Sequence, residues 1–180
     1  MWKCQSWINQ CNHLVKTQRP DLLIIIQKYH YEFIEEPKNG ESDEEYKNDY
    51  LTKEFQEQID LYSKYTKKIL IDTPMYELST SISYNLAKKV ELGERLDGMK
   101  ITYSREELSY VHQHTNRRLS HIQCDKCIWM NSQSYLCYSN GTCPLIDWKC
   151  PLTIFKNDGS HLSIYGRHLI YPMYRDTISH

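Results

Sequence analysis

Residues 19–29 read Arg19-Pro20-Asp21-Leu22-Leu23-Ile24-Ile25-Ile26-Gln27-Lys28-Tyr29 and contain the longest aliphatic run in the chain. A run of this kind, without alternating polar residues, is typical of a strand that is buried on both faces in a parallel sheet. We therefore predict such a strand over 22–26. Tyr29-His30-Tyr31 follows it, where open α/β sheets place their ligands. His30 is thus a candidate site residue, with an ordinary loop histidine as the alternative.

The spacing of apolar residues predicts further elements on either side of this strand. Helices are expected over 1–18, 49–68 and 79–95, a second buried strand over 69–72, a helix from a capping box at Ser104 and Glu107 to Arg118, and a short third strand over 121–124. A strand, a helix and a strand in this order form a right-handed parallel crossover by default. The predicted class is α/β, a three-layer α/β/α sandwich with a short parallel sheet. His112 and His114 are two residues apart on a helix and cannot form a metal pair on one face.

The length and composition of the chain limit the classes of protein to which it can belong. The 180 residues predict one domain over 1–180, and the formal charge of −1 gives no electrostatic case for nucleic acid or for an acidic membrane surface. No window is apolar enough for a membrane span, and the first residues lack the apolar core of a signal peptide. The acidic and polar stretch 34–48 is predicted to be a mobile surface loop, with an acidic metal-binding loop as the alternative.

Five of the seven cysteines lie in a cysteine-rich loop over 124–151. Cys124, Cys127, Cys137 and Cys143 could hold zinc, but the second pair is badly spaced for a zinc ribbon. Disulfides need an oxidising compartment, and the glycosylation sequon at Asn140 in the same loop agrees with a luminal or extracellular setting. We favour disulfides, of unassigned connectivity, over zinc.

A second informative stretch reads Asn157-Asp158-Gly159-Ser160-His161-Leu162-Ser163-Ile164-Tyr165-Gly166-Arg167-His168-Leu169. Asp158 is expected on a loop, and a helix is expected to run on toward Pro172. A carboxylate three residues before His161 can accept the Nδ1–H bond and leave Nε2 to take a proton from a hydroxyl. The alternative is a surface turn that caps the helix.

These two stretches resemble the Lys/Arg-Pro-Asp strand and the last motif of a known family. The family is the SGNH-hydrolase domain at the C-terminal end of acyltransferase-3 type membrane O-acyltransferases, especially the nematode-like set. The resemblance implies an SGNH/flavodoxin-like fold and acyl transfer without a cofactor, with His161 as base and Asp158 as its orienting acid. It also implies an acyl donor, a hydroxyl acceptor, an upstream membrane acyltransferase domain, and a luminal or extracellular location.

The family's serine nucleophile has no counterpart in the chain. The sequence contains no Gly-Asp-Ser and no Gly-x-Ser-x-Gly, and Ser160 does not follow a strand. The family's first strand would precede Met1, so we expect an N-terminally incomplete domain that keeps the Asp–His pair and is inactive alone. At the strand end, Lys28 could bind a developing negative charge, or it could simply be solvated. The alternative function is a secreted, disulfide-stapled binding module in which Asp158 and His161 are structural.

Overall fold

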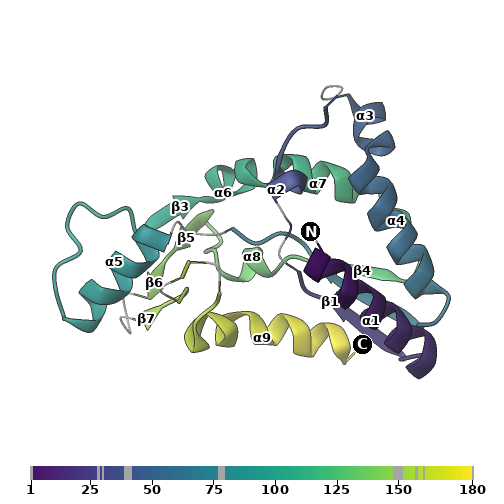
Figure 1. The fold of residues 1–180 in the computed structure, drawn as a ribbon. Coiled ribbons are helices and arrows are strands. Elements are labelled where there is room, and N and C mark those ends of the chain that lie inside the picture. Colours follow the sequence, from purple (N-terminus) through teal and green to yellow (C-terminus); the bar gives the residue numbers. More distant parts are fainter. Residues whose placement is uncertain are drawn as a thin grey trace. The chain divides into compact units, whose positions relative to one another are not determined.

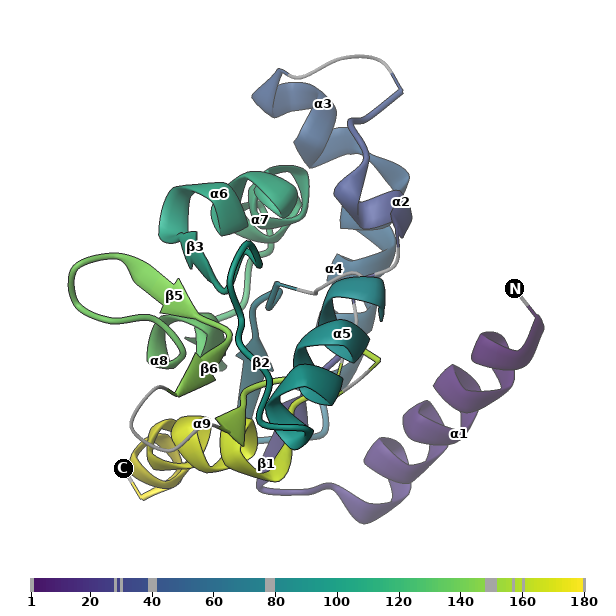
Figure 2. The ribbon, with the colours of Figure 1, turned by 90° about the vertical axis from the view of Figure 1, so that its left-hand side faces the viewer.

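The computed structural model describes the chain except residues 1, 28, 30, 39–41, 77–79, 148–151, 157, 160 and 180, and it leaves the side chains of 2–5, 31, 32, 80 and 152 undescribed. The chain divides into two compact units. The sheet unit comprises Met1–Pro74 and Gln113–Met130, and the motif unit comprises Met75–His112 and Asn131–His180. Figures 1 and 2 show their helices and strands from two sides, and each unit is described by itself.

The sheet unit is built on three parallel strands in the order β1(Leu22–Ile25), β2(Lys68–Asp72), β4(Cys127–Met130). The parallel pairing and the first two strands confirm the predicted class, an α/β sandwich with a short parallel sheet. The prediction of a third strand over 121–124 is wrong. The chain turns at Asp125 and Lys126, and the residues that pair with β2 begin at Cys127.

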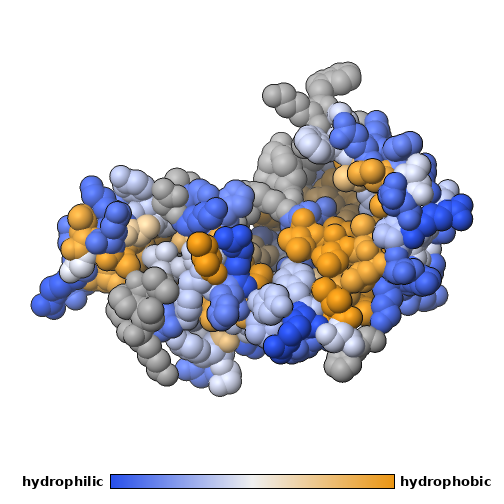
Figure 3. Space-filling model, turned by 90° about the horizontal axis from the view of Figure 1, so that it is seen from below, coloured by the Kyte–Doolittle hydropathy of each residue, from blue (hydrophilic) through white to orange (hydrophobic). Residues whose placement is uncertain are grey.

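β1 is not buried on both faces, which corrects the prediction for 22–26. Ile24 is 39% exposed and Ile26 is 65% exposed, whereas four of the five β2 residues are buried. The reason is position, because β2 has a strand on each side while β1 has one neighbour among the described strands. Figure 3 shows apolar side chains on the surface over the part of the molecule that carries α1 and β1.

One face of this sheet is covered by α1(Trp2–Gln18), α4(Tyr50–Ser63) and α7(Gln113–Ser120). Their apolar residues form a core cluster with the strands: Val15, Tyr29, Phe55, Ile59, Tyr62, Ile69, Ile71, Leu119 and Ile122. Successive strands are added in one direction along the sheet, so crossovers of one hand place α4 and α7 on the same face.

The acidic stretch 34–48 is only partly a loop. After α2(Tyr31–Ile34), residues Asp43–Asn48 form α3, which corrects the loop prediction for that half. The Ser42 side chain accepts a 3.2 Å bond from the backbone N–H of Glu45, and the acidic first turn suits the positive end of the helix. Tyr46 is 1% exposed, so this helix is anchored by tertiary packing.

The motif unit combines short antiparallel strand pairs with helices. Its elements are α5(Thr80–Glu91), β3(Thr102–Ser104), α6(Arg105–Val111), α8(Ser132–Tyr135), β5(Thr142–Pro144), β6(Ile146–Asp147), β7(Leu152–Thr153) and α9(Ile164–Ile178). β3 pairs with β5, β6 pairs with β7, and α9 packs against β7 and α8. The buried core residues are Tyr76, Leu86, Leu108, Leu136, Cys143, Leu145, Ile154 and Phe155.

The predicted capping box is confirmed, but the helix that it opens is shorter than predicted. Ser104 Oγ accepts from the Glu107 N–H at 3.1 Å, and Glu107 Oε2 accepts from the Ser104 N–H at 2.8 Å. The helix ends at Val111, because His112 has φ −110° and ψ 15°. Residues 113–120 then form α7 in the other unit.

Two disulfides, Cys124–Cys127 and Cys137–Cys143, confirm the preference for disulfides over zinc. They consume the four thiolates that the zinc hypothesis required. Among the described cysteines, Cys11 is a free and exposed thiol. No described helix has the length and apolar composition needed to cross a membrane. The assignment of 1–180 to one domain stays a prediction.

Candidate functional site

The Asp158–His161 stretch lies on a closed loop of the motif unit. Phe155 and Leu162 form an antiparallel bridge at its base, and the Lys156 N–H donates to the His161 carbonyl at 2.8 Å. Gly159 donates its N–H to the Lys156 carbonyl at 3.0 Å and has φ 76°, a left-handed conformation that glycine adopts without strain. The backbone thus turns sharply between the two side chains of interest.

Asp158 and His161 are brought together as predicted. Asp158 Oδ2 lies 3.0 Å from His161 Nδ1, and Asp158 Oδ1 accepts from the backbone N–H of His161 at 2.9 Å. A carboxylate at Nδ1 places the proton of the neutral imidazole on that nitrogen, so Nε2 carries the lone pair. The side chains are 73% exposed for His161 and 44% exposed for Asp158, so a reacting group can approach the ring from solvent.

The residues after His161 fix the loop to the core. Ser163 Oγ accepts from the Gly166 N–H at 3.0 Å, which caps α9, and donates to the Thr153 carbonyl at 2.6 Å. The Ser163 N–H donates to the Ile154 carbonyl at 2.9 Å. Ser163 thus supplies the cap of α9, and the alternative that the Asp158–His161 stretch is a surface turn next to a helix cap stays a prediction.

Gly166 allows α9 to approach the strand beneath it. A β-carbon at Gly166 would lie 2.2 Å from the Ile154 carbonyl oxygen. The helix that was predicted to run toward Pro172 is confirmed as α9, and it continues past that proline to Ile178. The inward side of the helix is held by the core, and Pro172 removes a single backbone donor from it.

Sequence reasoning missed some supporting residues. Tyr165 donates its hydroxyl to the Asp147 carboxylate, and Thr153 receives the Ser163 hydroxyl. Neither Asp147 nor Thr153 stands in a recognisable pattern with the residue that it contacts. These partners come from the β6–β7 pair, ten or more positions earlier in the sequence.

The structure gives less information on the other site residues that the sequence predicted. Lys28, His30 and Ser160 lie outside the described residues. At the end of the sheet strands, the Tyr29 hydroxyl donates to the Asp72 carbonyl at 3.1 Å, and burial raises the pKa of Tyr29. We predicted that Asp158 and His161 lie beside the ends of the parallel strands. The pair belongs to the motif unit and the strands to the sheet unit, so this placement stays a prediction.

Asn140 is exposed, and its Oδ1 accepts from the Thr142 N–H at 3.0 Å. Its carbohydrate acceptor role stays a prediction. Among the described residues, no group of three or more His, Cys, Asp or Glu side chains is arranged to hold a metal ion.

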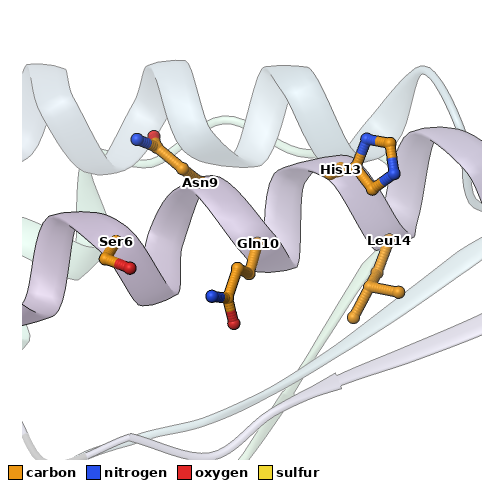
Figure 4. A pocket seen from close by; sticks show the side chains of 5 residues that line it. All are labelled: Ser6, Asn9, Gln10, His13 and Leu14. Atoms are coloured by element: carbon orange, nitrogen blue, oxygen red, sulfur yellow. The ribbon is translucent and has the colours of Figure 1, made fainter.

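A shallow hollow beside α1 is lined by Ser6, Asn9, Gln10, His13 and Leu14. Figure 4 shows Asn9 and His13 on one side of the helix and Gln10 and Leu14 on another. These side chains come from a single helix and do not converge on a point, so the hollow lacks the convergent polar groups of a ligand site.

Comparison with known protein families agrees with the family resemblance of the stretch that contains Asp158 and His161. The family described as SGNH domain (fused to AT3 domains) matches residues 2–176. Neither the curated proteins nor the solved structures give a match to the chain.

Proposed function

The chain belongs to the family of SGNH domains that are fused to AT3 domains, and on this premise we propose that it serves O-acyl transfer or acyl-ester hydrolysis in a membrane acyltransferase. His161 is the general base, and Asp158 orients it. The observation that supports this proposal is the contact between Asp158 Oδ2 and His161 Nδ1. The acyl donor supplies the ester or thioester carbonyl, and a hydroxyl compound accepts the acyl group.

The proposed chemistry follows from the two side chains. His161 Nε2 takes the proton of a serine hydroxyl while the oxygen attacks the acyl carbonyl, and the Asp158 carboxylate stabilises the imidazolium that forms. The imidazolium then returns the proton to the leaving group. The second contact of Asp158, with the backbone N–H of His161, holds the carboxylate in place without using the ring.

We also propose that these 180 residues do not catalyse the reaction alone. The sequence contains no Gly-Asp-Ser turn, so the nucleophilic hydroxyl is supplied by residues outside them. Removing one member of a serine triad lowers the rate by roughly 10⁴ or more in well-studied hydrolases. A serine-reactive fluorophosphonate should therefore leave the purified chain unlabelled, and labelling at one defined serine would contradict the proposal.

The catalytic assignment is tested in the intact membrane acyltransferase. His161→Gln and Asp158→Asn should each lower acyl transfer by roughly 10³-fold or more, because the first removes the base and the second favours the wrong tautomer. His13→Gln is the matched control, since His13 is an exposed histidine of α1 in the sheet unit. Equal activity of His161→Gln and the control would refute the role of His161.

The bond from the His161 backbone to Asp158 favours a second candidate, a disulfide-stapled binding module in which the pair only shapes the loop. In that case His161→Gln would keep full acyl transfer, while Asp158→Ala would lower the stability of the loop. The two candidates therefore differ in the response to a substitution at position 161.

We place the domain on the luminal or extracellular side of the membrane. Two disulfides support an oxidising compartment, and the exposed Asn140 sequon supports glycosylation there. Treatment of the intact protein with an N-glycosidase should shift its mass, and Asn140→Gln should abolish that shift. A cytosolic location would give no shift in either protein.

A further inference from the structure

The two disulfides differ in how far solvent reaches their sulfurs. Cys124 and Cys127 of the sheet unit are both partly exposed, and both pack against its core cluster. In the motif unit, Cys143 is 0% exposed and is itself a core residue, so one end of the Cys137–Cys143 bond is shielded. Thiol–disulfide exchange requires that a thiolate reach a disulfide sulfur. The first bond is therefore open to exchange, and the second is protected.

The turn that carries the Cys124–Cys127 bond is also held by hydrogen bonds. Just before it, the Gln123 N–H donates to Gln56 Oε1 at 2.7 Å, and Gln56 Nε2 donates to the Gln123 carbonyl at 2.9 Å. Within the turn, the Cys127 N–H donates to the Cys124 carbonyl at 3.3 Å. These bonds keep the two cysteines close together when the S–S bond is broken, so the disulfide can form again.

Lys126, between the two cysteines, fastens the turn to the end of α4 and to β2. Its ammonium donates to the carbonyls of Ser63 at 2.5 Å and Thr66 at 2.9 Å, and its own carbonyl accepts from the Ile69 N–H at 2.9 Å. The disulfide joins residues three positions apart, so breaking it releases a very short ring. We therefore expect the reduced turn to keep its place in the fold.

Ser63 makes the two sulfurs of this bond different. Its hydroxyl lies 3.8 Å from Cys124 Sγ, and Ser63 is the donor because a disulfide sulfur carries no hydrogen. A hydrogen bond to the charged form of a group stabilises that form, so the Ser63 hydroxyl stabilises a thiolate on Cys124. Exchange favours the better leaving thiolate. Cys124 is thus the leaving sulfur, and Cys127 is the sulfur that an incoming thiol attacks.

We propose that Cys124–Cys127 is a reversible exchange site for small thiols of the glutathione class, whereas Cys137–Cys143 is structural. A glutathione thiolate attacks Cys127 Sγ and forms a new S–S bond there, while the electron pair of the broken bond stays on Cys124. A second glutathione thiolate attacks the sulfur of the bound glutathione, which forms oxidised glutathione and releases Cys127 as a thiolate. The protons of the two glutathione thiols end on Cys124 and Cys127, so the protein gains two electrons.

The exchange site uses no atom of the Asp158–His161 pair. The two proposals therefore hold or fail independently, and the experiment on the disulfide needs no acyl-transfer activity.

The test is a time course of the oxidised 180-residue chain in glutathione, stopped with N-ethylmaleimide and read by peptide mass spectrometry. Cys124–Cys127 should open roughly tenfold faster than Cys137–Cys143, or more, because the second bond has a buried sulfur. In samples stopped early, Cys127 should carry glutathione and Cys124 should carry the maleimide. Cys11, a free and exposed thiol, reacts with the maleimide without glutathione and is the internal reference.

Variants test the role of Ser63 and the independence of the fold from the bond. Ser63→Ala should slow the opening of Cys124–Cys127 by roughly three- to tenfold, the range expected for the loss of one hydrogen bond. Ser6→Ala, at an exposed serine of α1, is the matched control and should leave the rate unchanged. Cys124→Ser with Cys127→Ser should keep the circular dichroism spectrum and the cooperative urea unfolding of the wild type.

Three results would overturn the proposal. These are equal rates of opening for the two disulfides, loss of folded structure when the Cys124–Cys127 bond is reduced or replaced, and glutathione on Cys124 in place of Cys127. Equal rates for Ser63→Ala and Ser6→Ala would refute the part assigned to Ser63.

Discussion

Substituting Gly166 with alanine tests the packing that holds the Asp158–His161 loop. The added methyl group would lie 2.2 Å from the Ile154 carbonyl oxygen and 3.1 Å from its carbonyl carbon. Carbon needs roughly 3.5 Å from such neighbours, so the start of α9 must move by about 1 Å. That oxygen also accepts the Ser163 N–H bond, which the movement would lengthen.

Two opposing effects set the size of the change. Alanine favours a helix over glycine by about 1 kcal/mol. Overpacking costs about 1–3 kcal/mol, and weakening the buried hydrogen bond costs about 1 kcal/mol more. We expect Gly166→Ala to lower the free energy of unfolding by about 1–3 kcal/mol, and the melting temperature by roughly 3–10 °C for a chain of this size.

The assay is urea unfolding of the 180-residue chain, with Arg167→Ala as control. Arg167 is the exposed neighbour of Gly166, so its substitution should change stability by no more than about 0.5 kcal/mol. The imidazole ¹⁵N signals of His161 give a second measurement, since a moved helix start also disturbs the loop. A variant as stable as the wild type, with unchanged signals, would show that the close approach has no energetic weight.

Three further outcomes follow from the structure. Arg118→Met should lower the free energy of unfolding by about 3–5 kcal/mol in urea. The 2%-exposed guanidinium is held by the Asp49 carboxylate and by the backbone carbonyls of Phe33 and Glu35, and a change below about 1 kcal/mol would contradict this. Lys100 lowers the pKa of Glu107 by a side-chain hydrogen bond, so the pair stabilises the fold above the ordinary carboxyl pKa and this is lost as pH falls through the lowered value. An NMR titration should find that Lys100→Met raises the pKa of Glu107, and an unchanged pKa would refute the pairing. Replacing Cys137 and Cys143 by alanine opens a short loop and should lower stability by about 2 kcal/mol in thermal unfolding, whereas no loss would argue against the bond.

The strands show what an aliphatic run can predict. Residues 22–26 and 69–72 were recognised because such runs are rare outside strands and buried helices. The run over 22–26 does not say how many neighbours its strand has. Burial on both faces was therefore predicted for β1, although among the described strands of this sheet it is found for β2 alone. β4 was placed several residues too early because Cys127-Ile128-Trp129-Met130 lies inside a stretch interpreted as a cysteine-rich loop.

The acidic stretch shows a different limit. Its composition predicts solvation, but the buried ring of Tyr46 packs under Arg117, whose guanidinium lies 4.6 Å from the ring centre. Arg117 also forms a hydrogen-bonded ion pair with Asp43. Both partners are about 70 positions away in the sequence, and no local pattern reports on contacts of that range. Long-range packing therefore ordered a helix that composition alone excluded.

The Asp158–His161 pair was predictable because it is local, since two intervening residues bring a carboxylate and an imidazole within reach of each other. What keeps the pair in place is not local. Ser163 caps α9 with one lone pair and binds the Thr153 carbonyl with its proton, so the same hydroxyl fixes the helix and the loop to β7. Gly166 then lets the helix lie directly on that strand's continuation. Ser163 and Gly166, two and five residues after the histidine, are thus needed for the same reason. Replacing either of them would free the loop that presents the imidazole.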